Sequence, residues 1–267
     1  MPLTASVIHG AARKPSYHFP MPEVLQHPPG YPPGSVGDPL AALRAATASR
    51  HAWVDRSMPL GQAASDADAL DANILDVDAF DINAYRLHLL LIRQWLAPVE
   101  AWLASFDDGP QDRADPAAPA QLAALDADLV ALDGGLAPLD DDLAGLRCTP
   151  PAGAAAARPA APRRSTSDSD SAFRWGVCYV LEGSRLGGLV LHQRVAGPLA
   201  PHRPTYLCGD REAVGRRWRI FMQRLRAAVT GRAQIERACA GACAAFDDLI
   251  DVVTAALPAA AAGAPER

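Results

Sequence analysis

The sequence YVLEGSRLGG (residues 179–188) lies in an apolar run, residues 172–195, whose pattern otherwise predicts one long helix. A glycine inside a helix costs about 1 kcal/mol relative to alanine, so several of them together need a reason. The small residues of this stretch are spaced so that they share one helical face: Gly183, Ser184, Gly187 and Gly188. That face carries almost no side chains, so a bulky group can lie directly against the backbone.

Two explanations fit such a bare helical face. Small residues four positions apart allow a second helix to approach closely, which would make the stretch a packing surface. Alternatively, a flat cofactor lies on the face, because a planar macrocycle needs a wide surface free of side chains. The stretch by itself leaves both explanations open.

Helical patterns continue outward from this stretch. The first begins near Asp38, which can cap a helix that has Pro39 at its first position. Alternating strand patterns are scarce, and the one over 77–81 is too short to predict a strand. We therefore expect an all-α fold, a single-domain helical bundle over residues 38–257. The other predicted helices cover residues 83–103, 120–132, 169–195, 210–228 and 233–257.

Three segments of low complexity lie around and within this bundle. Residues 1–37 are rich in proline and glycine and are predicted to form a disordered tail. Residues 148–170 (CTPPAGAAAARPAAPRRSTSDSD) are predicted to be a loop insertion, and residues 258–267 a frayed end. None of the three has the apolar content needed for a core of its own.

The composition narrows the class of protein. The net charge is −5, from 25 Lys and Arg against 30 Asp and Glu, which argues against a nucleic-acid surface. No apolar run approaches the ~20 residues that span a membrane, and residues 1–15 lack the apolar core of a signal peptide.

The five cysteines fit no disulfide framework, and Cys239 and Cys243 are more typical of small buried apolar residues than of a metal pair. We expect a cytoplasmic protein.

His51 is the first candidate for chemistry. It lies on the same helical stripe as Leu43 and Thr47, so it is either a hydrogen-bonded core residue or a metal ligand. One imidazole can hold a heme iron as its proximal ligand, whereas a structural zinc site needs about four ligands. Glu182 is expected to point away from the glycine face and to form an ion pair.

Four segments in order carry a resemblance to a known family: LRAATASRH (43–51), YRLHLLLIRQWLAPVEAWL (85–103), WGVCYVLEGSRLGG (175–188) and VGRRWRIFMQRL (214–225). Together they resemble the bacterial biliverdin-producing heme oxygenases, in particular the type associated with bacterial phytochromes. The resemblance covers residues 38–255, and its most specific part is YVLEGSRLGG. It implies an enzyme that opens heme to biliverdin, releasing iron and carbon monoxide, with molecular oxygen and electrons from an external donor such as ferredoxin with its reductase.

The resemblance also implies roles for individual residues. His51 would be the proximal iron ligand, and a distal helix would present Gly183, Ser184, Gly187 and Gly188 to the heme. Heme propionates need cations, and a guanidinium suits a carboxylate well. Family position favours Arg219 for this role, with Arg44 as a further candidate, and Tyr179 is placed near the heme edge. The resemblance implies either a bacterial phytochrome as acceptor of the pigment or a role of the reaction in iron acquisition, and the sequence leaves both open.

One difference between this sequence and the family pattern bears on enzymatic activity. Animal-type members carry a carboxylate directly after the first distal glycine, where this chain has Ser184. The phytochrome-associated type commonly lacks that acid, so turnover remains the expected function. The alternative is a heme-binding sensor or carrier on the same fold that does not turn heme over. A helical partner protein without heme is a third interpretation.

Overall fold

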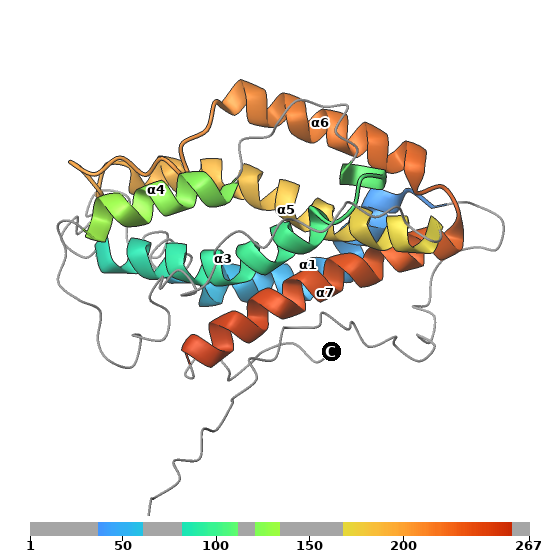
Figure 1. Ribbon diagram of the computed structural model, residues 1–267, viewed down its shortest axis with the longest axis horizontal. Helices are drawn as coiled ribbons and strands as arrows, with labels where there is room; N and C mark the ends of the chain where they lie inside the picture. Colours follow the sequence, from blue (N-terminus) through green and yellow to red (C-terminus); the bar gives the residue numbers. More distant parts are fainter. Residues whose placement is uncertain (1–36, 61–81, 112–120, 134–167, 258–267) are drawn as a thin grey trace, which may run out of the picture. The chain divides into compact units, whose positions relative to one another are not determined.

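The computed structural model describes residues 37–60, 82–111, 121–133 and 168–257. These residues form α-helices and a short 3-10 helix and contain no strand (Figure 1), which confirms the predicted all-α class. The elements are α1 (Pro39–Ser57), α3 (Ile82–Leu103), η2 (Gly109–Gln111), α4 (Gln121–Asp133), α5 (Asp168–Val195), α6 (Arg211–Ala228) and α7 (Arg232–Ala256).

Helix boundaries follow the local signals in the sequence. The side chain of Asp38 accepts a hydrogen bond from the backbone nitrogen of Leu40 at 3.3 Å, and α1 begins at Pro39. Asp210 caps α6 in the same way through the backbone nitrogen of Glu212 at 3.0 Å. Pro98 lies inside α3, and the helix continues through it to Leu103.

Helix α7 packs against α1, α3 and α5. Its approach to α5 depends on Gly176 of α5 and Gly241 of α7. A Cβ atom on Gly176 would overlap the carbonyl oxygen of Ala238, and one on Gly241 would overlap the carbonyl oxygen of Phe173. Close helix packing through glycine therefore occurs in this fold at Gly176, seven residues before Gly183 on the same helix.

Asp128 of α4 attaches the connection between α5 and α6 to the rest of the bundle. Its carboxylate is buried and accepts hydrogen bonds from the Tyr85 hydroxyl, from the hydroxyl and backbone nitrogen of Thr205, and from the backbone nitrogen of Tyr206. A carboxylate with this many donors is compensated for its loss of water. The attachment also fixes the neighbouring Leu207, which lies beside the C-terminal half of α5.

Several predictions concern segments outside the described residues. They are the disordered tail apart from its last residue, most of the 148–170 insertion, the frayed end and the short 77–81 pattern. The last three residues of the predicted insertion belong to α5, which begins at Asp168. All described helices fall within the unit Val36–Arg267. No helix in the described part of the chain is both long and apolar enough to cross a membrane.

Candidate functional site

The glycine stretch lies where α5 passes from the core to the surface. Residues 172–177 are buried, whereas those from Gly183 onward are at least partly exposed as far as Arg194. A Cβ atom added to Gly183 or Gly187 would meet no other described atom within 4 Å. Gly188 differs, because its Cβ would lie 3.6 Å from the Leu207 side chain, an ordinary contact with the connection to α6.

Among the described residues, Gly183 and Gly187 differ from the glycines of α5 and α7 that allow close helix packing. If Gly183 and Gly187 served close helix packing, an added Cβ would collide with a neighbouring backbone, as it does at Gly176. The described residues place no such backbone over them. Leu186 and Val190 lie three and seven positions after Gly183 on the same side of α5, and their side chains are 37% and 52% exposed. Around Gly183 and Gly187 the face is therefore apolar and exposed, with Leu186 and Val190 beside the glycines.

The polar side chains next to this face, Ser184 and Glu182, form hydrogen bonds within the protein. The Ser184 hydroxyl donates a hydrogen bond to the Leu181 carbonyl oxygen of its own helix at 2.8 Å. The hydroxyl oxygen can still accept a hydrogen bond. Glu182 receives two hydrogen bonds from Arg217, at 2.7 and 2.6 Å. As expected, Glu182 forms an ion pair, and the pair joins α5 to α6.

His51 is exposed on α1 and is not a core residue. Its side chain is 64% exposed, and its Nδ1 lies 2.8 Å from Oδ2 of Asp55 one turn later. The hydrogen bond to this carboxylate raises the pKa of His51, against the opposing effect of partial burial. Because Nδ1 is bonded to Asp55, Nε2 is the nitrogen left to coordinate a metal, which is the usual arrangement of a metal-binding histidine. The sequence reasoning missed Asp55, although an acid four positions after a histidine on a helix is a readable signal.

Arg44 and Tyr179 are brought together from α1 and α5. Tyr179 is half-buried, with its ring 5.8 Å from that of Trp218 on α6. Burial raises the pKa of the Tyr179 hydroxyl, and the neighbouring Arg44 guanidinium opposes part of this shift. Arg44 itself is exposed, so its charge remains accessible. Tyr179 lies one turn before Gly183, and this contact therefore places a cation of α1 near the start of the glycine face.

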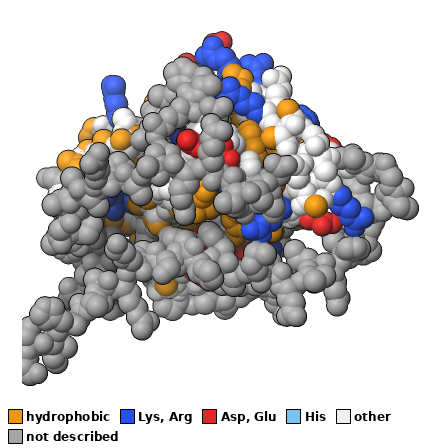
Figure 2. Space-filling model, turned by 45° about the vertical axis from the view of Figure 1, so that its right-hand side comes forward, with side chains coloured by type: hydrophobic (Ala, Val, Ile, Leu, Met, Phe, Trp, Pro, Cys, Tyr) orange, Lys and Arg blue, Asp and Glu red, His pale blue; other side chains and the backbone are white. Residues whose placement is uncertain are grey.

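Arg219 is exposed on α6 and forms no ion pair with the residues that the structure describes. The structure gives no contact that joins it to His51, Arg44 or Tyr179. In Figure 2, arginine and hydrophobic side chains alternate over the upper part of the view, where α6 lies, in agreement with the exposure of Arg216, Arg219 and Ile220.

Cys239 and Cys243 of α7 are free thiols. Burial raises the pKa of Cys239 to about 12 and also raises that of Cys243. Within the described ranges, no group of three or more His, Cys, Asp or Glu side chains is arranged to hold a metal ion.

Searches of protein-family models, curated proteins and solved structures found no match to this chain.

Proposed function

We propose that this protein is a heme oxygenase that opens heme to biliverdin and releases iron and carbon monoxide. The observation that carries the proposal is the open, apolar face over Gly183 and Gly187. Backbone without side chains can lie flat against a macrocycle, and such a face is otherwise unfavourable by about 1 kcal/mol for each glycine. The order of the sequence segments, with a histidine on the first helix and the glycines on a later one, supports the same function.

The residues present fit a heme. His51 would bind the iron through Nε2, while Asp55 orients the imidazole and makes it a stronger ligand. Exposure of His51 in the heme-free protein fits this role, because a ligand must be reachable. Arg44 would hold one propionate beside Tyr179, and the accessible Arg219 would hold the other.

When bound, heme would supply the iron at which oxygen is activated and would itself be the substrate, with electrons from an external donor. The protein would hold the heme in a fixed orientation and would order water molecules beside it. Ser184 offers only an acceptor, since its hydrogen is bound to Leu181, and it would orient a water molecule by accepting one of its hydrogens. The pigment would pass to a bacterial phytochrome.

A second candidate function is heme binding without turnover. One observation favours it: Glu182, the carboxylate nearest to the glycines in sequence, is held by Arg217. If no other acid lies near the bound oxygen, the supply of protons would depend on water alone.

Turnover of hemin separates the two functions. The hemin-loaded protein is expected to show a Soret band, and addition of ascorbate, or of ferredoxin with its reductase, should replace that band with the red absorption of biliverdin. Release of carbon monoxide, trapped by ferrous myoglobin, provides an independent readout. A stable ferrous–oxygen spectrum without pigment would favour the heme-binding protein, and no histidine-ligated spectrum at all would contradict both functions.

Substitution of Gly187 tests whether heme uses the glycine face. Gly187→Leu places an isobutyl group on the open surface and is expected to weaken hemin binding at least about tenfold, because ring and side chain cannot occupy the same space. Gly187→Ala is the matched control for folding and should gain up to about 1 kcal/mol of unfolding free energy. Hemin titration followed at the Soret band measures the first effect and urea unfolding the second. Unchanged hemin affinity in Gly187→Leu would place the heme elsewhere.

A further inference from the structure

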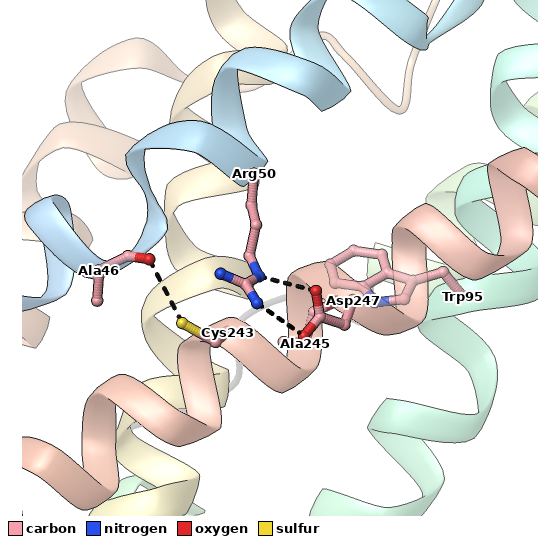
Figure 3. A network of polar contacts seen from close by, with 6 residues as sticks. All are labelled: Ala46, Arg50, Trp95, Cys243, Ala245 and Asp247. Atoms are coloured by element: carbon pink, nitrogen blue, oxygen red, sulfur yellow. Dashed lines mark hydrogen bonds and ion pairs between the residues drawn. The ribbon is translucent and has the colours of Figure 1, made fainter. Parts of the chain in front are cut away.

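A set of polar contacts links α1 and α3 to α7 next to His51 (Figure 3). Arg50 donates from Nε to Oδ1 of Asp247 at 2.7 Å and from Nη2 to Oδ2 at 3.2 Å. One turn earlier on both helices, the Cys243 thiol donates to the carbonyl oxygen of Ala46 at 3.4 Å. From α3, the Trp95 indole donates to the carbonyl oxygen of Ala245 at 2.9 Å. The segment 243–247 of α7 is thus held from two sides.

The Arg50–Asp247 pair is the strongest of these contacts. Both of its hydrogen bonds are charge-assisted, and the two side chains are only 13% and 21% exposed. Solvent therefore screens the pair weakly, and loss of one partner leaves the other charge poorly compensated. The geometry is bidentate, which restricts rotation as well as distance.

The pair lies directly beside the proposed iron ligand. His51 follows Arg50 on α1, and Phe246 precedes Asp247 on α7. The rings of His51 and Phe246 meet edge to face with centroids 5.9 Å apart. Asp55 also holds His51, but it belongs to α1 and moves with that helix. The placement of His51 relative to the rest of the bundle therefore depends mainly on the contacts between α1 and α7, because the link from α1 to α6 through Asp38 and Arg226 lies at the other end of α1.

We propose that Arg50 and Asp247 are positioning residues that hold the His51 imidazole where it can ligate the iron. This proposal rests on the proposed heme function. The ion pair fixes the rotation of α1 about its axis and its register along α7. Without it, the remaining contacts, such as that of Cys243 with Ala46, hold α1 less tightly on α7, and the His51 imidazole takes a wider range of positions.

Arg50→Met and Asp247→Asn test this role through hemin binding. Each is expected to raise the hemin dissociation constant about tenfold or more, as loss of groups that support a metal ligand generally does. Arg93→Met is the matched control, because it breaks another ion pair between helices, Arg93–Asp126 at 2.6 Å, away from α1. The control should retain wild-type affinity and the wild-type ferric spectrum. The double variant Arg50→Asp with Asp247→Arg restores the pair in reverse and should recover part of the affinity.

Hydrogen exchange of the heme-free protein supplies a readout independent of heme. Amides of residues 46–54 should exchange faster in Arg50→Met than in wild type, and Arg93→Met should leave them unchanged. Wild-type hemin affinity and spectrum in both variants would overturn the positioning role alone, even if their melting temperatures fell. A wild-type protein that fails to bind hemin through His51 would instead overturn the proposed function and the positioning role with it.

Discussion

Gly176→Ala is expected to destabilise the protein by about 3 kcal/mol, although alanine is the better helix former by about 1 kcal/mol. The added Cβ atom would overlap the Ala238 carbonyl oxygen and would lie 2.8 Å from the Ala242 nitrogen. These are backbone atoms, so no side chain can rotate away. Helices α5 and α7 would have to separate, which would open the core around Trp175 and Val177. Such a loss is a large part of the total stability of a domain, typically about 5–15 kcal/mol.

Urea unfolding followed by circular dichroism measures this effect. Gly183→Ala is the matched control, since it adds the same atom to the same helix where nothing described lies within 4 Å. Its unfolding free energy should equal or exceed that of wild type. Gly241→Ala repeats the test from the other helix, because its Cβ would overlap the Phe173 carbonyl oxygen. Wild-type stability of Gly176→Ala would contradict the described packing of α5 on α7.

His51→Ala is expected to abolish axial histidine ligation of bound hemin while leaving the fold intact. The side chain is 64% exposed and its hydrogen bond joins it to its own helix, so unfolding of the heme-free protein should change by no more than about 0.5 kcal/mol. Ligation should change completely, because one imidazole supplies the protein's only proposed bond to the iron. The measurement is the optical and electron paramagnetic resonance spectrum of the hemin-loaded protein.

Two additions make the His51 experiment decisive. Imidazole added to His51→Ala should occupy the vacated position and restore a histidine-like spectrum. His192→Ala serves as the control, because His192 is an imidazole in the last turn of α5, beyond the glycines. Loss of ligation in His192→Ala, with a normal spectrum in His51→Ala, would move the ligand to α5 and would contradict the assignment.

The helices were predictable because their determinants are local. Capping by Asp38 and Asp210 and the recurrence of apolar residues act within one or two turns, so the predicted helix limits agree with the observed ones within one or two residues. An ion pair at Glu182 was also predicted, although the sequence did not identify Arg217 as the partner. Asp55 could have been found, since it lies one turn from His51 on the same helix.

The small-residue surface of α7 was missed although the sequence contains its signal. Ala238, Gly241, Ala242 and Ala245 recur at three- and four-residue steps and are all buried. Such a surface predicts a close neighbour but does not say which helix supplies it.

The sequence by itself determined where the helices lie and that the glycines in α5 need a reason. These properties depend on residues within a few turns of one another. Only the tertiary structure decided which glycines pack against another helix and which have no described neighbour within 4 Å, because that depends on the segments that the fold brings beside each glycine. The same holds for Arg50 and Asp247, which are 197 residues apart in the chain and meet only because α1 packs on α7.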